Sequence, residues 1–348
     1  MPGILTTMHA WVRRTRQFPV WLLTAFLLAC SGAPVQSKTR ETLDPDTEIT
    51  PFVNEMVGRH GFERDQLERI LAGVRVRPEI LEAIQRPAES LNWYQYRPIF
   101  LTESRISQGE AFWRKHADTL ASASAEYGVS PEIIVAIIGV ETLYGTRKGK
   151  HLVLDSLATL AFRYPRRSQF FRSELEQFLI LSRQENLDAT QVKGSYAGAM
   201  GIPQFISSSY RRYAVDFDGD GVRDLLNSES DAIGSVANYL KVHGWQRDGA
   251  VALPASVTGD GYKPLVEKGM KPHMPVSEMQ NFGVIVLYSS DNDARGALIE
   301  LTNEDDTEHW IGLQNFYAIT RYNHSALYAM AVFQLAREIE KRYQGVEG

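Results

Sequence analysis

The sequence predicts a mainly α-helical protein of the α+β class, and three features of the chain support this prediction. Helical patterns occupy most of the chain from about residue 52 to 244. Between residues 249 and 319 the pattern changes, because 281–288 and 296–301 are short runs rich in β-forming residues that predict strands. The pattern then returns to helix from about residue 326 to 343.

The N-terminus has the composition of an export signal. Arginines at positions 13, 14 and 16 precede an apolar stretch, residues 18–29, which is too short to span a bilayer. We therefore expect residues 1–29 to be a signal peptide. Leu27-Leu28-Ala29-Cys30 resembles the bacterial lipobox, whose cysteine is lipidated, although an incidental cysteine is the alternative. Since Cys30 is the only cysteine, the exported chain cannot form an internal disulfide.

A polar segment and a helical region follow the export signal. Residues 30–50 are polar and contain proline, which predicts a lipidated tether. We expect residues 51–115 to form a helical region that lines a groove, because its aromatic run from residue 91 to 100 includes Tyr96. The formal net charge of −5 argues against a general nucleic-acid binder.

One carboxylate ends an otherwise apolar helix in the middle of the chain. Ser130 and Pro131 are typical of an N-cap and a first helical position, and Gly145 is typical of a helix end. The apolar residues from 133 to 140 leave no polar face, so we expect this helix to run through a core. Burial and the negative end of the helix dipole would favour a protonated Glu141 near neutral pH, as a general acid requires. The alternative is a structural glutamate that caps a helix or pairs with an arginine.

A segment rich in small residues is the second candidate for the site. Residues 194–205 are rich in glycine and alanine, with Ser195 and Gln204 among the polar groups. Small residues let the backbone approach either a ligand or a neighbouring helix closely, and both interpretations remain open. Pro203 predicts the first turn of a short helix that continues to Tyr210.

A polar and aromatic segment precedes the last helix. Residues 317–325 include Tyr322 and Asn323. Aromatic rings with hydrogen-bonding groups suit a sugar-binding groove, while tyrosines that simply fill the core and its rim are the alternative.

An acidic loop that begins at Asp216 follows the spacing of an EF-hand. The residues at its first, third, fifth, sixth, seventh and ninth positions are Asp216, Asp218, Asp220, Gly221, Val222 and Asp224. The twelfth position is Asn227, where a bidentate glutamate is expected. Since closely spaced aspartates repel one another without a cation, we favour a structural ion over a metal-free acidic turn.

The chain closely resembles the membrane-bound lytic murein transglycosylase B family in three segments. These segments are Val-Glu-Thr-Leu-Tyr-Gly, which contains Glu141, residues 194–205 and residues 319–325. The resemblance extends from about Phe52 to Tyr343. It implies a goose-lysozyme-like helical core with Glu141 as the catalytic glutamate. It also implies functional roles, in catalysis or in binding the glycan, for Ser195, Gln204, Tyr322, Asn323, Tyr96, Tyr239 and Tyr328.

The resemblance implies a lyase that cleaves the β-1,4 bond between N-acetylmuramic acid and N-acetylglucosamine in peptidoglycan, leaving a 1,6-anhydromuramyl end. Hydrolytic glycosidases usually need two carboxylates, and the sequence offers only Glu141 in a suitable setting. In the family's reaction this glutamate acts first as an acid and then as a base, while Ser195 and Asn323 orient the groups involved. A hydrolytic muramidase and a non-catalytic wall-binding lipoprotein are the alternatives.

The resemblance also implies a bound ion, a location and a division of the chain. In the family the acidic loop is closed by the aspartate that opens the next helix, which here is Asp231, and Glu229 and Asn227 are the alternatives. The expected ion is Ca²⁺, and Na⁺ is also compatible. No organic cofactor is expected. The expected partners are peptidoglycan strands, the outer membrane through the lipid anchor, and other cell-wall enzymes, all in the periplasm, with no nucleic acid. The expected regions are a catalytic core, a small β region and a C-terminal helix that completes the core, at residues 116–248, 249–319 and 320–348.

Overall fold

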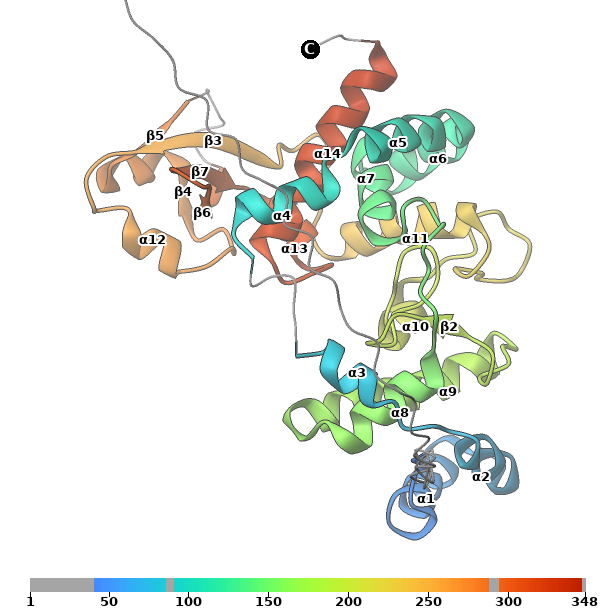
Figure 1. The fold of residues 1–348 in the computed structure, drawn as a ribbon. Coiled ribbons are helices and arrows are strands. Elements are labelled where there is room, and N and C mark those ends of the chain that lie inside the picture. The colour runs from blue at the N-terminus through green and yellow to red at the C-terminus, as the bar shows by residue number, and fades with distance from the viewer. Residues whose placement is uncertain (1–40, 86–90, 288–293, 346–348) are drawn as a thin grey trace, which may run out of the picture. The chain divides into compact units, whose positions relative to one another are not determined.

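A computed structural model describes residues 41–85, 91–287 and 294–345 (Figure 1). The predicted signal peptide, Cys30 and residues 31–40 of the predicted tether lie outside the described residues. The described helices are α1 (Thr50–His60), α2 (Arg64–Ala72), α3 (Pro78–Ala83), α4 (Trp93–Phe100), α5 (Glu103–Lys115), α6 (Ala117–Tyr127), α7 (Pro131–Thr142), α8 (Val153–Arg163), α9 (Ser168–Gln184), α10 (Ser207–Tyr213), α11 (Glu229–Val242), α12 (Lys263–Glu267), α13 (Gln314–Thr320) and α14 (Ala326–Gln344). The described strands are β1 (His151–Leu152), β2 (Lys193–Gly194), β3 (Ala252–Val257), β4 (Met274–Pro275), β5 (Val284–Val286), β6 (Arg295–Thr302) and β7 (Thr307–Gly312). The mainly helical fold class is therefore confirmed.

The folded part begins earlier than the expected end of the tether at residue 50. Leu43 and Ile49 are buried in the main hydrophobic core. Asp44 caps a single π-helical turn, Pro45–Ile49, because its carboxylate accepts the backbone N–H groups of the second and third residues after it. The last residues of the predicted tether are therefore part of the packed structure.

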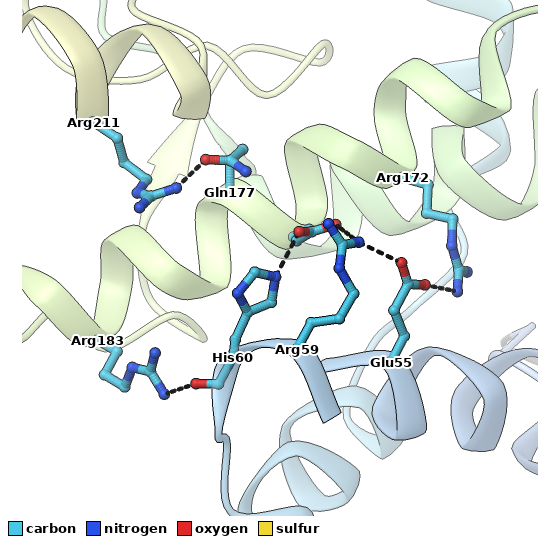
Figure 2. A network of polar contacts seen from close by, with 8 residues as sticks. Glu55, Arg59, His60, Arg172, Gln177, Arg183 and Arg211 are labelled. Carbon is cyan, nitrogen blue, oxygen red and sulfur yellow. Dashed lines mark hydrogen bonds and ion pairs between the residues drawn. The ribbon is translucent and has the colours of Figure 1, made fainter. Parts of the chain in front are cut away.

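A polar network joins α1 to α9 (Figure 2). His60 at the end of α1 contacts Glu176 of α9, with 2.6 Å between Nε2 and Oε1. Glu55 accepts a 2.9 Å hydrogen bond from Arg172. Arg183 donates to the carbonyl of His60 at 3.0 Å, so the C-terminus of α1 is satisfied by a side chain of α9. These contacts fix the N-terminal helices on the helical core.

Helix α7 is buried along its length, as its apolar sequence predicts. Every residue from Ile133 to Gly139 is buried, and α5, α6, α11 and α14 pack around it. No single helix among the described residues is long and apolar enough to cross a membrane, although α6 and α7 meet that test together as a pair bent by 112°.

The end of α7 differs from the prediction that the helix continues to Gly145. The last helical residue is Thr142, and Leu143 and Tyr144 adopt left-handed backbone angles, with φ of 48° and 56°. The turn is held by the Tyr144 side chain, whose hydroxyl donates to the carbonyl of Arg105 at 2.8 Å. This phenol fills a slot at Gly139, where a Cβ would lie 2.5 Å from the hydroxyl oxygen. Packing of Tyr144 thus stops the helix before the glycine does.

The β region is a five-stranded sheet in which each neighbouring pair of strands is antiparallel, in the order β4-β6-β7-β3-β5. Strand β6 confirms the run predicted at 296–301. The strand predicted at 281–288 is shorter, because a 3₁₀ helix occupies Val276–Phe282 and ends at Gly283, whose φ is 81°. One face of the sheet covers a separate small core that includes Leu298 and Ile311.

Candidate active site

Glu141 lies in the last turn of α7 and is partly buried. The hydroxyl of Tyr328 donates a 2.6 Å hydrogen bond to its Oε1 atom. Tyr328 is placed by the cap of α14, because the Ser325 side chain accepts the backbone N–H of Tyr328 at 3.2 Å. Burial raises the pKa of Glu141 to about 7, although the Tyr328 hydrogen bond acts to lower it. Glu141 can therefore both release and accept a proton near neutral pH.

The alternative interpretation of Glu141 as a structural ion-pair residue finds no support in the described contacts. Among the described residues, no arginine or lysine forms a salt bridge with Glu141. Its hydrogen-bonding partner is a neutral phenol from a helix far along the sequence. A carboxyl group in this setting keeps its proton more readily than a paired one.

The small-residue segment forms a tight loop in place of the expected start of a helix. The loop is closed by a backbone hydrogen bond in which the N–H of Ser195 donates to the Ala199 carbonyl at 2.8 Å. The Ser195 hydroxyl oxygen accepts the Ala199 N–H at 3.0 Å. Helix α10 begins only at Ser207, because Gln204 is left-handed with φ of 51° and breaks any helix begun at Pro203. The prediction of a short helix from Pro203 is therefore wrong.

This loop packs closely against α8, which supports the packing interpretation, while the approach to a ligand stays a prediction. A Cβ at Gly198 would lie 2.4 Å from Leu157 of α8, which shows that the glycine permits close packing. The side-chain amide of Gln204 donates to the carbonyls of Lys148 and Gly201, at 3.2 and 2.9 Å. Both amide hydrogens are used in this way, which leaves the Gln204 carbonyl oxygen as an acceptor.

Two hydrogen bonds fasten the loop beside Glu141. The hydroxyl of Thr142, which is fully buried, donates to the Ile202 carbonyl at 2.7 Å. The hydroxyl of Tyr322 donates to the Pro203 carbonyl at 2.6 Å. Thr142 was not predicted as a functional residue, although its place directly after Glu141 at the end of an apolar helix could have indicated it.

The predicted tyrosines Tyr239, Tyr322 and Tyr328 pack next to one another, and Tyr328 contacts Glu141. We call Phe205, Tyr239, Tyr322 and Tyr328 the tyrosine cluster. The rings of Tyr322 and Tyr328 are stacked at 10° with centroids 6.4 Å apart, and Tyr239 packs edge-on against Tyr322 at 4.8 Å. Tyr96 of α4 is 2% exposed, and the pKa of Tyr328 is raised mainly by burial, with Tyr96 contributing last. Tyr96, Tyr239 and Tyr328 are thus mainly core residues.

Two further aromatic residues, His243 and Tyr213, pack against the tyrosine cluster and were not predicted to lie there. His243 stacks on Tyr239 with centroids 4.0 Å apart, and Tyr213 packs edge-on against the same ring at 5.0 Å. The hydroxyl of Tyr239 donates to the carbonyl of Arg321 at 2.5 Å, next to Tyr322. Asn323 follows in the same connection, and its carbonyl accepts the N–H of Ser325 at 2.7 Å.

The acidic loop brings together three of its predicted ligands. Asp216, Asp218 and Asp231 each offer a carboxylate oxygen within 4.8 Å of the other two. Two oxygens bound to one Ca²⁺ at about 2.3–2.6 Å lie at most about 5 Å apart, so this spacing fits a single ion. Asp220 lies outside the group, and its carboxylate accepts the N–H of Val222 at 2.8 Å.

Among the three residues considered for closing the loop, the geometry favours Asp231. Its side chain is almost fully buried at the start of α11, and burial raises its pKa. Glu229 is paired instead with Lys115 at 2.5 Å. The Asn227 amide donates to the carboxylate of Asp224 at 3.0 Å. Glu229 also lies outside the group of carboxylates formed by Asp216, Asp218 and Asp231.

Known proteins match this chain over nearly its whole length. The transglycosylase SLT domain family matches residues 44–337. The chain is 40% identical over 354 residues to the membrane-bound lytic murein transglycosylase B of Escherichia coli (strain K12), covering 92% of this chain and 97% of that protein.

Two solved structures share the fold. The soluble lytic transglycosylase SltB1 of Pseudomonas aeruginosa is 47% identical, with a TM-score of 0.80 over 85% of this chain and 99% of that one. The Escherichia coli lytic transglycosylase Slt35 in complex with calcium is 40% identical, with a TM-score of 0.78 over 90% of this chain and 99% of that one. The chain therefore belongs to the family of lytic transglycosylases with an SLT domain.

Proposed function

We propose that this protein is a lytic murein transglycosylase that cleaves the β-1,4 bond between N-acetylmuramic acid and N-acetylglucosamine. The observation that carries the proposal is Glu141, a single carboxyl group with a pKa of about 7 that is hydrogen-bonded to the tyrosine cluster. Hydrolysis by two carboxylates would require a second acidic side chain across the bond. Among the described residues, no other carboxylate hydrogen-bonds to the tyrosine cluster.

The reaction has two steps that use the same side chain. Glu141 first donates its proton to the glycosidic oxygen as the C1–O bond breaks, and the acetamido oxygen of the muramyl sugar stabilises the cationic C1. The resulting carboxylate then removes the proton of the muramyl C6 hydroxyl, whose oxygen attacks C1. The product is a 1,6-anhydro end, Glu141 regains its proton, and no water is consumed.

Hydrogen-bonding capacity suggests roles for the polar residues of the loop. The Ser195 oxygen accepts from Ala199, so its own hydrogen can be donated to the acetamido group. Gln204 retains an acceptor for a glycan hydroxyl or amide group. We expect Asn323 to help orient the acetamido group, and Tyr322 to contact the glycan while fixing the loop. Tyr96, Tyr239 and Tyr328 would form the wall behind these groups.

Product analysis tests this function directly. Purified sacculi digested with the protein should release muropeptides whose muramyl end is lighter by one water than the hydrolytic product. Release of reducing ends only would identify a hydrolytic muramidase on the same scaffold. Absence of any released fragment, with binding to sacculi retained, would identify a wall-binding lipoprotein without activity.

We also propose that Asp216, Asp218 and Asp231 hold a structural Ca²⁺, with Asp220 and the carbonyl of Val222 completing the site when the ion is present. The spacing of the three carboxylates and the burial of Asp231 support this proposal. Three carboxylates at this distance repel one another strongly unless a cation compensates them. Na⁺ would satisfy the same charge less completely. Glu141 itself needs no metal for proton transfer.

The proposed location is the periplasmic face of the outer membrane. The sequence supports it through the apolar segment that ends at Cys30. Lipidated Cys30 would hold the enzyme beside peptidoglycan strands, its substrate, and near other cell-wall enzymes. Replacement of Cys30 by alanine should move the protein from the outer-membrane fraction to the soluble periplasmic fraction. An unchanged membrane fraction would rule out this anchor.

A further inference from the structure

We propose that Arg105 and Tyr144 are positioning residues for Glu141, which hold the end of α7 so that this carboxyl group stays buried and aligned with Tyr328. We call Arg105 and Tyr144 the helix clamp. The inference rests on the proposed function, because that function makes Glu141 the group that transfers the proton. It adds two residues for which the sequence predicted no role.

The backbone directly after Glu141 is strained. Leu143 and Tyr144 both adopt left-handed angles, a region that residues other than glycine rarely occupy. Such residues persist only where the surrounding structure enforces their conformation. The last carbonyl groups of a helix also lack partners within the helix. The end of α7 therefore needs contacts from other elements to keep Glu141 in one position.

Tyr144 supplies the first of these contacts. Its side chain is buried, and its hydroxyl donates to the carbonyl of Arg105 in α5 at 2.8 Å. Two glycines make room for this hydroxyl, because a Cβ at Gly109 of α5 or at Gly139 of α7 would lie 2.5 Å from its oxygen. Burial raises the pKa of Tyr144, while Arg105 acts to lower it, so the phenol keeps its proton and remains a donor near neutral pH.

Arg105 supplies the second contact, from α5 to α7. Its Nε atom donates to the carbonyl of Gly139 at 3.1 Å, two residues before Glu141. A cation at this end of the helix also complements the negative end of the helix dipole. The side chain is partly buried, and among the described residues no carboxylate forms a salt bridge with it. Backbone carbonyls are therefore its hydrogen-bonding partners.

The same guanidinium group also reaches α4. Its Nη1 atom donates to the carbonyl of Ile99 in the last turn of that helix, and its carbon lies 5.2 Å from the centroid of the Phe100 ring. Helix α4 packs against α14, which carries Tyr328. Arg105 thus connects the helix that carries Glu141 with a helix that supports its hydrogen-bonding partner.

The acid strength of Glu141 depends on this packing. Burial is the main cause that raises its pKa to about 7, and the Tyr328 hydrogen bond acts against it. The neighbouring phenols of Tyr322 and Tyr328 stay protonated, because burial first and the charge of Glu141 second raise their pKa values. The other carboxylate of α7, Glu132, lies in its first turn, at the opposite end. Water admitted at the end of α7 would therefore lower the pKa of Glu141.

Arg105→Met removes both side-chain hydrogen bonds of the clamp and keeps most of the length of the side chain. The pKa of Glu141 should fall by about one unit, towards its ordinary value of 4.5. The alkaline limb of kcat/KM should move down by the same amount, because this limb reports the essential acid of the free enzyme. The value of kcat should fall about ten- to a hundredfold, the usual scale for a small misplacement of a catalytic group.

Two milder variants test the contacts separately. Tyr144→Phe leaves the ring in place and removes the donor to the Arg105 carbonyl, so the pKa of Glu141 should fall by about half a unit. Arg105→Lys keeps the charge but lacks the planar fork that reaches two helices, so its effect should lie between those of the unaltered protein and Arg105→Met. Both variants preserve most of the packing and keep the proposal testable if Arg105→Met does not fold.

The pKa of Glu141 can be measured without substrate, by NMR of protein labelled with ¹³C at the side-chain carboxyl groups of glutamate. The resonance that is missing from Glu141→Gln identifies Glu141. Arg114→Met is the matched control, because Arg114 lies on the same helix and donates to the carbonyl of Tyr343 in α14 at 3.2 Å. This control should lower the Tm and leave the pKa of Glu141 unchanged.

A purely structural role would lower the Tm of the clamp variants and leave both the pKa of Glu141 and the alkaline limb in place. That result, or an upward shift of the pKa, would overturn the proposal. A failure of the proposed function would appear separately, as a lack of anhydro products from the unaltered protein, while the NMR titration would still report on the clamp.

Discussion

The raised pKa of Glu141 has a consequence for stability that can be measured without any substrate. A carboxyl group that titrates at about 7 in the folded protein and near its ordinary value of 4.5 in the unfolded chain binds more protons when folded between these values. The free energy of unfolding must therefore fall as the pH rises from 4.5 to 7. At about 1.36 kcal/mol for each pKa unit, the whole interval corresponds to about 3 kcal/mol.

Glu141→Gln removes this dependence while it keeps the size of the side chain and an oxygen that can accept the Tyr328 hydrogen bond. Because Glu141 is only partly buried, we expect about two thirds of the full amount, about 2 kcal/mol. The variant should match the unaltered protein in stability at pH 4.5 and exceed it by about 2 kcal/mol at pH 8. The protein would thus lose stability at neutral pH because it keeps an acid in this position.

Urea unfolding followed by circular dichroism at several pH values measures the difference. The comparison of two proteins cancels the contributions of all other titrating groups. Parallel curves, with the same difference in unfolding free energy at pH 4.5 and pH 8, would refute the reasoning, because Glu141 would then titrate alike in the folded and unfolded states.

Three further predictions concern the surroundings of Glu141. Tyr328→Phe removes a hydrogen bond that lowers the pKa of Glu141, so the alkaline limb of kcat/KM should move up by about one pH unit; a limb that stays in place would show that the contact does not affect the acid. Calcium at 100 times its Kd should stabilise the protein by about 2.7 kcal/mol and raise its Tm, while Asp216→Ala with Asp218→Ala should abolish this response; an unchanged response would place the ion elsewhere. Gly139→Ala should destabilise the protein by more than about 2 kcal/mol, because its Cβ would meet Tyr144. Gly58→Ala in α1 is the control, since its Cβ would have nothing within 4 Å, and it should stabilise the protein by about 0.5–1 kcal/mol. Thermal unfolding that ranks the two variants in the opposite order would contradict the packing described for Tyr144.

The sequence predicted those elements whose local pattern and tertiary setting agree. Helix α14 follows the predicted bounds almost residue for residue, because its apolar stripe faces the core and Ser325 caps it. The burial of α7 followed from the lack of any polar face. The pairing of Glu141 with Tyr328 could not be predicted from pattern, since the two residues are 187 positions apart and meet only through packing.

The wrong predictions arose where long-range packing overrode a local signal. Gly145 suggested the end of α7, but Tyr144 needs a left-handed turn to reach its slot at Gly139. Pro203 suggested a helix start, but its carbonyl is used by Tyr322. Strands β3 and β7 were not foreseen as separate strands, because neither segment alternates clearly between polar and apolar residues.

The central claim is that Glu141 alone transfers the proton in both steps of the cleavage. The most direct measurement is the rate at which the Glu141→Gln protein releases anhydro-muropeptides from sacculi, with its fold checked by circular dichroism. The glutamine can neither donate nor accept this proton, so we expect the rate to fall by a factor of about one hundred or more with the fold intact. Release of the same anhydro products at the rate of the unaltered protein would contradict the claim.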